Sequence, residues 1–175
     1  MHVDYVAPTT IEDAVGALSS TPESRVFAGA TDLIPQIRSG RPEPGLLVDL
    51  KHIDRLTAVT EGADGWTIGA AAPTSRLTED PGFSSQFPGL SEAAGLIGSD
   101  QIQNRSSLGG NLCNASPAAD SVPAMLVNDA RAVVATADGT RTVGVAEIAT
   151  GPGRTSLAPG EFIVEFEVVS PPAHT

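Results

Sequence analysis

The sequence predicts an α+β protein built from two small lobes. In the first 54 residues, segments of helical and strand character alternate, as in a helix–strand–helix–strand unit. From residue 55 onward, short apolar segments separated by turn residues indicate paired antiparallel strands. Residues 162–169 alternate apolar side chains with glutamates, which is typical of a half-buried strand. We therefore expect one lobe at residues 1–54 and a second at residues 55–175.

The first lobe is expected to begin with a well-marked helix. Apolar residues recur with helical spacing after Thr10, and Asp13 follows Thr10 at the distance found in a capping box. Gly40 and Pro42 are typical of the end of the second helix. The elements predicted for this lobe are a helix at 10–19, a strand at 25–28, a helix from 33 to about 40 and a strand at 46–50.

The second lobe is expected to contain two hairpins and several short helices. Asp138-Gly139 is a strong hairpin signal between two apolar segments. Pro123 is compatible with a helix only if it lies in the first turns. The predicted elements are strands at 56–60 and 66–70, helices at 73–77, 90–97 and 117–128, and strands at 131–136, 141–145 and 162–169.

Composition excludes several classes of function. The net charge of −11 argues against non-specific binding to nucleic acid or to an anionic membrane surface. A single cysteine, Cys113, cannot form a disulfide within the chain or hold an iron–sulfur cluster, and we expect it to be a buried structural thiol. The sequence has no signal-peptide pattern and no apolar run long enough for a membrane helix, so we expect a cytoplasmic protein without membrane insertion.

The most informative segment of the sequence is residues 102–120. Its adjacent glycines, Gly109 and Gly110, allow positive φ angles and a close approach of a ligand to the main chain. Small amide and hydroxyl side chains surround them, including those of Ser107 and Asn111. This density of small polar groups predicts a loop that binds a polar ligand through its backbone.

A second loop, residues 27–32, joins a predicted strand to a predicted helix. Free amides at a helix N-terminus are a common place for a phosphate group. A glycine after a strand more often makes an ordinary strand-to-helix turn. The loop matches neither the P-loop nor the full dinucleotide-binding fingerprint, which excludes both of those readings.

Taken together, these segments resemble the FAD-binding subunit or domain of the molybdenum hydroxylases, a family that includes carbon monoxide dehydrogenase and xanthine dehydrogenase. The resemblance covers nearly the whole chain in the same order. The matching segments are FAGATDLIPQIRSG at 27–40, LVDLKHIDRL at 47–56, WTIGAAAPTSRL at 66–77, IQNRSSLGGNLCNASPAADSVPAML at 102–126 and LAPGEFIVEFEV at 157–168.

The resemblance implies the two-lobed FAD-binding domain of the vanillyl-alcohol-oxidase type, also called the PCMH type. It implies no catalytic residue and no metal ligand in this chain. FAD would lie between the lobes, with additional contacts to Asp120, to the main chain near Ile163 and to Ile97. The remaining cofactor-binding positions carried over from the family are Ala28, Gly29, Ala30, Thr31 and Asp32 at the pyrophosphate, and Ser107, Leu108, Gly109, Gly110 and Asn111 in the second loop.

The function implied by the resemblance is that of an electron-transfer subunit. A molybdopterin subunit would oxidise the substrate, and an iron–sulfur subunit would pass the electrons to FAD in this chain. The reduced flavin would then deliver them to NAD, a quinone or oxygen. The protein positions and tunes such a cofactor, and the chemistry belongs to the flavin.

Two departures from the family pattern keep other functions open. Ala30 stands where the family commonly has a second glycine, which would cost on the order of 1 kcal/mol if the position requires positive φ. The C-terminal domain usual in the family is absent from this sequence. The alternatives are an assembly or interaction module with weak or no FAD binding, and a stand-alone FAD reductase or oxidase.

Overall fold

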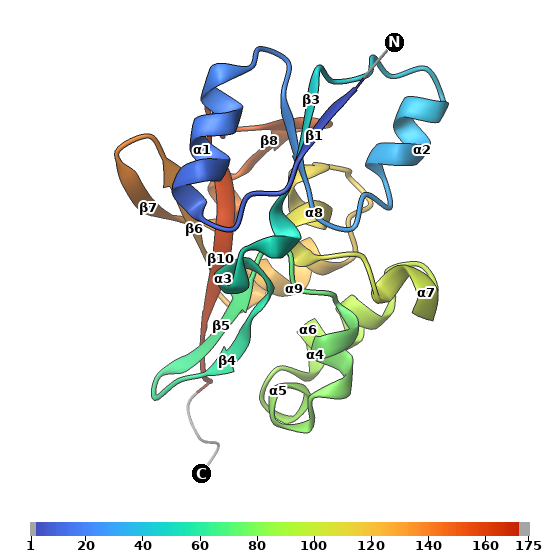
Figure 1. Ribbon diagram of the computed structural model, residues 1–175. Coiled ribbons are helices and arrows are strands. Elements are labelled where there is room, and N and C mark those ends of the chain that lie inside the picture. The colour runs from blue at the N-terminus through green and yellow to red at the C-terminus, as the bar shows by residue number, and fades with distance from the viewer. Residues whose placement is uncertain (1–2, 172–175) are drawn as a thin grey trace.

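The computed structural model describes residues 3–171, and its strands form two main sheets (Figure 1). One sheet has the order β1-β3-β2 and the other the order β4-β5-β10-β6-β7, beside a small β8-β9 pair. The mixed architecture confirms the predicted α+β class. The strands are β1 (Asp4–Val6), β2 (Arg25–Phe27), β3 (Leu46–Asp49), β4 (Val59–Glu61), β5 (Gly65–Gly69), β6 (Arg131–Thr136), β7 (Gly139–Gly144), β8 (Ala149–Gly151), β9 (Arg154–Thr155) and β10 (Phe162–Val169).

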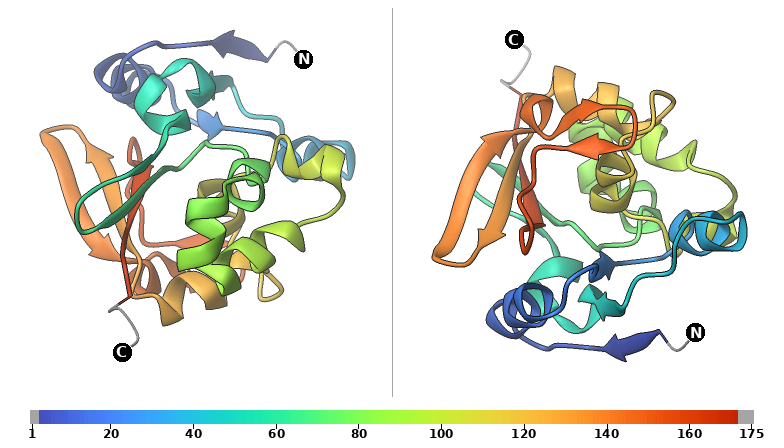
Figure 2. Two further views of the ribbon diagram at one scale, coloured as in Figure 1. Left: turned by 90° about the horizontal axis from the view of Figure 1, so that it is seen from below. Right: turned by 90° about the horizontal axis from the view of Figure 1, so that it is seen from above.

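The helices are short, and those of the second half of the chain gather on one side of the five-stranded sheet (Figure 2). The first sheet and its helices pack at the end of the larger sheet where β10 begins. The helices are α1 (Ile11–Ser20), α2 (Leu33–Arg38), α3 (Asp54–Thr57), α4 (Ser75–Glu79), α5 (Pro81–Gln86), α6 (Pro88–Gly95), α7 (Asp100–Gln103), α8 (Leu108–Cys113) and α9 (Ser121–Val127), with 3₁₀ turns at Leu50–His52 and Val145–Glu147.

The three-stranded sheet is parallel, which requires crossover connections between its strands. Helices α1 and α2 supply elements of these connections, and α1 begins as predicted, because the Thr10 hydroxyl accepts a hydrogen bond from the Asp13 amide at 3.1 Å. Strand β1 was not predicted from the sequence. It has only three residues and all are exposed, so it lacks the alternation that marks a strand.

The five-stranded sheet is antiparallel, with β10 paired to β5 on one side and to β6 on the other. The predicted hairpin at Asp138-Gly139 is confirmed by the pairing of β6 with β7. The strand predicted at 56–60 is partly wrong, because Leu56 lies in α3. Its side chain is fully buried, and its carbonyl accepts a hydrogen bond from the Ala71 amide at 2.8 Å.

The helix predicted from residue 117 begins at Ser121 instead. Pro123 is therefore the third residue of α9. At this position proline removes no intrahelical hydrogen bond, because the first amides of a helix have no acceptor within it. The proline itself thus explains why the helix begins late.

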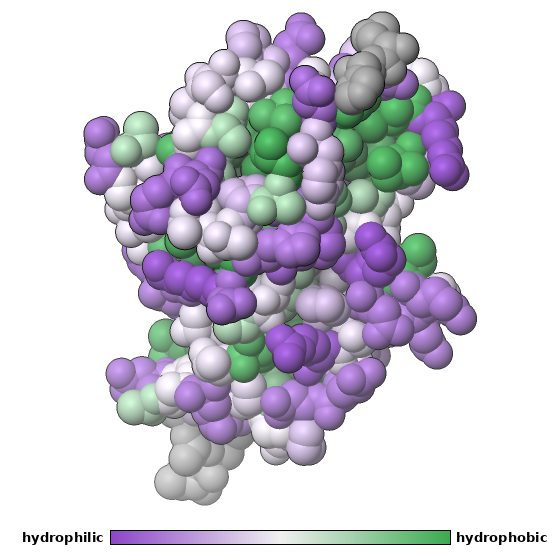
Figure 3. Space-filling model, viewed as in Figure 1, coloured by the Kyte–Doolittle hydropathy of each residue, from purple (hydrophilic) through white to green (hydrophobic). Residues whose placement is uncertain are grey.

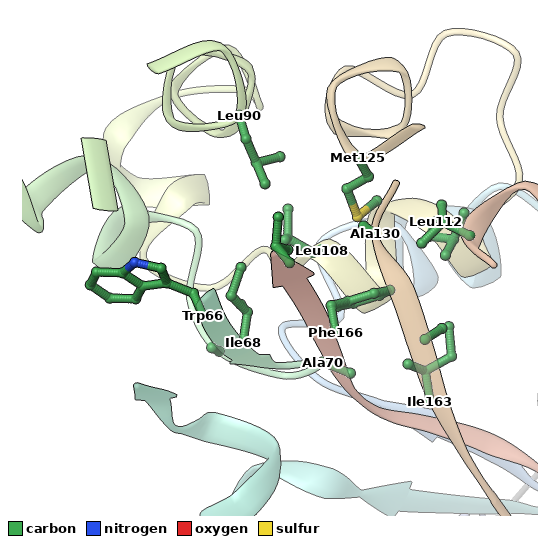
Figure 4. Close-up of a cluster of buried hydrophobic side chains, with 14 of the residues drawn as sticks. Trp66, Ile68, Ala70, Leu90, Leu108, Leu112, Met125, Ala130, Ile163 and Phe166 are labelled. Atoms are coloured by element: carbon green, nitrogen blue, oxygen red, sulfur yellow. The ribbon is translucent and has the colours of Figure 1, made fainter. Parts of the chain in front are cut away.

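Two clusters of buried side chains form the core. The larger cluster joins the inner face of β5, β6 and β10 to the helices that cover it (Figure 4). The smaller cluster includes Leu46 and Val48 from the first sheet together with Phe162 and Val164 of β10. The first sheet therefore shares buried contacts with the larger one.

A partly buried ion pair ties α3 to the centre of the large sheet. Arg55 donates to both carboxylate oxygens of Glu165, from Nε at 2.9 Å and from Nη2 at 2.6 Å. Glu165 is only 8% exposed, and its hydrogen bonds raise the pKa of Arg55 above its ordinary value. Burial removes water from the Glu165 carboxylate, and the two hydrogen bonds from Arg55 compensate for that loss.

The outer surface is mainly polar on the face of Figure 3, with apolar side chains gathered over the first sheet and α2. Val6 and Ile34, from these elements, are 38% and 36% exposed. Within residues 3–171, no helix is long and apolar enough to cross a bilayer.

Replacement of Arg55 tests the contribution of the ion pair. Arg55→Met should lower the free energy of unfolding by about 1–3 kcal/mol, between the values typical of exposed and buried pairs, because Glu165 loses its partner. Urea denaturation followed by circular dichroism measures this difference. Arg131→Met, at an exposed site without an ion pair to residues 3–171, is the matched control, and an equal effect in both variants would contradict the role given to the pair.

Candidate functional site

A cavity of about 990 Å³ lies between the two main parts of the fold. This volume is at the upper end of the range of about 300–1,000 Å³ that is usual for small-molecule sites. Its walls come from three distant regions of the sequence, within 18–44, 106–114 and 155–163, together with a few single residues. Both glycine-containing segments singled out in the sequence contribute to it.

The first wall is the loop Ala28–Asp32, which follows β2 and leads into α2. All five predicted residues of this loop line the cavity. Ala30 adopts a φ of +57°, so this position is in the left-handed region. Among residues 3–171, no acceptor contacts the amides of Gly29, Ala30 or Thr31. Successive unpaired amides in such a turn form a concave site suited to an anion.

The loop is packed directly against the segment that precedes α8. A Cβ built on Gly29 would lie 1.8 Å from the carbonyl oxygen of Arg105. No side chain fits in that space, so the glycine is required for the approach of the two main chains and not for its φ angle.

The second wall is a helix, and the loop predicted there is wrong. Residues 108–113 form α8, and Gly109 and Gly110 are not among the residues with positive φ. Ser107 begins the helix, because its hydroxyl accepts a hydrogen bond from the Gly110 amide at 3.1 Å. Gly109 is needed for contact: its amide donates to the Ala70 carbonyl at 3.1 Å, and a Cβ would lie 2.5 Å from that oxygen.

The residues predicted from this segment do not all face the cavity. Ser107, Gly109, Gly110 and Asn111 line it. Leu108 is 1% exposed and points into the core (Figure 4), so only its main chain is available to a ligand. The side-chain oxygen of Asn111 is already occupied, because it accepts hydrogen bonds from the amide and hydroxyl of Ser121.

Three further predicted residues occupy different positions. Ile97 and Ile163 line the cavity, although both are largely buried. Asp120 is exposed at the N-terminal end of α9 and is not among the residues that line the cavity. Its neighbour Ser121 donates a hydrogen bond to Asn111, which lines the cavity.

Cys113 lies in the cavity wall, so the prediction of a buried structural thiol is wrong. It is an exposed residue that lines this cavity. Desolvation by the surrounding protein raises the pKa of the thiol to about 12, which keeps it protonated at neutral pH.

Two arginines in the cavity wall were not singled out from the sequence. Arg25 and Arg41 both line the cavity, and neither forms an ion pair with residues 3–171. Burial lowers the pKa of Arg25, and the charge of Arg41 lowers it further. Arg41 donates to Gln36, which in turn donates to Asn114 across the cavity at 2.8 Å. Isolated arginines carry no motif, so the sequence offered no signal for them.

No metal centre is visible in the part of the chain described. Residues 3–171 contain no group of three or more histidine, cysteine, aspartate or glutamate side chains placed to hold a metal ion. The polar groups that line the cavity are unpaired amides, small polar side chains, two guanidinium groups and the four carboxylates of Glu23, Asp32, Glu43 and Glu161. Of these, the unpaired amides and the guanidinium groups suit binding of an anionic organic ligand.

The strained conformation of Ala30 leads to a stability prediction. Ala30→Gly should raise the free energy of unfolding by about 1 kcal/mol, because glycine has no Cβ to oppose a φ of +57°. Thermal unfolding would show this as a rise in Tm of about 2–4 °C. Ala118→Gly, at an exposed position without positive φ, should give no rise. An unchanged or lower Tm in Ala30→Gly would contradict the strain.

The sequence matches the family described as FAD binding domain in molybdopterin dehydrogenase over residues 1–171. Among curated proteins, the chain is 33% identical over 163 residues to the xanthine dehydrogenase FAD-binding subunit of Escherichia coli O157:H7. That match covers 93% of this chain and 56% of the relative. A match to the carbon monoxide dehydrogenase medium chain of Hydrogenophaga pseudoflava is 29% identical and covers 94% of this chain and 58% of the relative.

The fold of the chain is also similar to solved structures of related enzymes. Carbon monoxide dehydrogenase from Hydrogenophaga pseudoflava superposes with a TM-score of 0.94 and 28% identity, covering 99% of this chain and 61% of that chain. Quinoline 2-oxidoreductase from Pseudomonas putida 86 superposes with a TM-score of 0.93 and 27% identity, covering 98% and 60%. The chain thus spans less than two thirds of the length of these relatives. With its fold and its sequence in agreement, the chain belongs to the family of FAD-binding domains of molybdopterin dehydrogenases.

Proposed function

We propose that this chain holds FAD in the cavity between its two sheets and acts as the FAD-binding electron-transfer part of a molybdenum hydroxylase-type dehydrogenase. The observation that carries the proposal is the meeting of two main-chain segments, Ala28–Asp32 and Ser107–Asn111, at one cavity of suitable size. The chain spans 56% of the xanthine dehydrogenase subunit it matches, so the activity of a complete enzyme belongs to this proposal.

The residues present fit such a cofactor. The amides of Gly29, Ala30 and Thr31 have no acceptor within residues 3–171, and a pyrophosphate would supply one. Gly110 lines the cavity, and a Cβ there would meet only the Ser107 hydroxyl, at 3.3 Å. The absent side chain therefore leaves room for a ligand and not for a neighbouring part of the fold.

Each part of the cavity has a proposed role. The loop after β2 would bind the pyrophosphate through its amides, and the start of α8 would bind the cofactor through its main chain. Residues 1–54 and 55–175 would act as two lobes that close on it. The proposed FAD-binding residues are Ala28, Gly29, Ala30, Thr31, Asp32, Ser107, Leu108, Gly109, Gly110, Asn111, Asp120 and Ile163; of these, Leu108 and Asp120 do not line the cavity.

The redox chemistry would come from the flavin, which can accept electrons from one partner and release them to another. The single cysteine means that iron–sulfur clusters would reside in a partner subunit. The relative named 6-hydroxypseudooxynicotine dehydrogenase complex subunit alpha is, by its name, part of a complex. We accordingly propose an iron–sulfur subunit and a molybdopterin subunit as partners, with NAD, a quinone or oxygen as final acceptor.

The absorbance spectrum of the purified protein tests the proposal. Visible flavin bands, and release of one FAD per chain on denaturation, are the expected result. Protein that stays colourless after incubation with FAD would overturn the proposal and favour an assembly or interaction role. Copurification with a subunit that carries iron–sulfur clusters would distinguish an electron-transfer subunit from a stand-alone FAD reductase or oxidase.

Gly110 gives the sharpest mutational test of the α8 wall. Gly110→Val should weaken FAD affinity by at least roughly a hundredfold, because the new side chain occupies the cavity. Circular dichroism should be unchanged, since a Cβ at this position meets only the Ser107 hydroxyl, at 3.3 Å, and a shift of a few tenths of an ångström relieves that contact. The control is Gly89→Val in α6, where a Cβ meets nothing within 4 Å and which does not line the cavity. Full FAD retention in Gly110→Val would refute the role of this wall.

A further inference from the structure

Lys51, the only lysine in the sequence, lies behind the loop that we propose for the pyrophosphate. Its ammonium group donates to the carbonyl oxygen of Ala28 at 2.8 Å and lies 4.4 Å from the centre of the Phe27 ring. Lys51 is not among the residues that line the cavity. It therefore contacts the loop from outside the cavity.

Lys51 is held in this position by a buried carboxylate. Asp49 is 4% exposed and accepts from Lys51 Nζ at 2.5 Å, from the Lys51 amide at 3.1 Å and from the Tyr5 hydroxyl at 2.9 Å. Burial acts to raise the pKa of Asp49, but these hydrogen bonds outweigh it and the pKa lies below its ordinary value. At neutral pH the carboxylate is ionised, so the ammonium group keeps its anchor.

Arg105 makes the equivalent contact one peptide further along. Its Nε donates to the carbonyl oxygen of Gly29 at 3.3 Å. The main chain of Arg105 also packs against Gly29, where no Cβ fits. Arg105 belongs to the segment before α8 and, like Lys51, does not line the cavity.

These two contacts fix the direction of the loop amides. In a trans peptide the C=O and the N–H of one unit point in opposite directions. The peptide whose carbonyl faces Lys51 therefore turns the Gly29 amide away from Lys51, and the peptide whose carbonyl faces Arg105 turns the Ala30 amide away from Arg105. Gly29 and Ala30 both line the cavity, and the amides of both lack an acceptor within residues 3–171.

We propose that Lys51 and Arg105 are positioning residues for the pyrophosphate of the cofactor: each holds a loop carbonyl and thereby directs the following amide N–H at a phosphate oxygen. The inference rests on the proposed function, since it concerns the same cavity. It implies that Lys51 and Arg105 increase the affinity for ligands that carry phosphate and not for other ligands, although neither residue lines the cavity.

The test compares three ligands on variants of the full chain. FAD and ADP both carry a pyrophosphate, and riboflavin carries none. Lys51→Met should raise the Kd for FAD and ADP roughly tenfold and leave that for riboflavin within about twofold. Arg105→Gln should act in the same direction by roughly three- to tenfold. Lys51→Arg, which keeps the charge and the donor, should recover most of the affinity, and Arg131→Gln controls for the loss of a distant charge.

The outcomes separate the inference from the function on which it rests. Equal weakening of riboflavin and FAD binding would mean a purely structural role, and unchanged FAD affinity in both variants would also overturn the inference. Failure of the wild-type chain to bind FAD or ADP would overturn the proposed function as well. Should Lys51→Met fail to fold, Arg105→Gln carries the test, because the Arg105 side chain is exposed.

Discussion

Contact between main chain and main chain is the constraint on which the cavity depends. Gly29 touches the Arg105 carbonyl and Gly109 touches the Ala70 carbonyl at distances that exclude any Cβ. Through these contacts the loop after β2, the end of β5 and the start of α8 meet without intervening side chains. The wall they form is largely backbone, so its binding capacity lies in amides whose directions are set by the surrounding hydrogen bonds.

Local signals in the sequence predicted much of the fold. Three elements were predicted from residues within or next to them: the helix that begins after Thr10, the hairpin at Asp138-Gly139 and the strand at 162–169. The glycine pair at 109–110 was misassigned for a physical reason. A glycine can be required either because its φ angle is positive or because another main chain lies too close for a Cβ. At Gly109 the close group is the Ala70 carbonyl, which is distant in the sequence, so the local pattern does not show which reason applies. Strand β1 was missed because pairing with β3, and not its own pattern, defines it.

The cavity wall was predicted where the loop Ala28–Asp32 forms it and missed where single side chains form it. Ala30 was expected to be strained if its position required positive φ, and its φ of +57° meets that condition. Arg25 and Arg41 lie outside the segments that match the family, and the segment 47–56 that contains Lys51 does not show what this side chain contacts, so only the fold reveals these contacts. Cys113 follows the buried Leu112 by one residue, and a single helical step of 100° is enough to move a side chain from core to cavity.

Helix α8 belongs to the core and to the cavity at once. Leu108 and Leu112 on one side are buried in the larger cluster, while Gly110 and Cys113 on the other side face the hollow. A ligand on the cavity side would therefore favour the packed state of the core side by mass action, adding about 2.7 kcal/mol when present at a hundred times its Kd. For such a chain, cofactor supply would act as a control on protein lifetime: under flavin shortage, the empty form would open more often and be exposed to proteolysis.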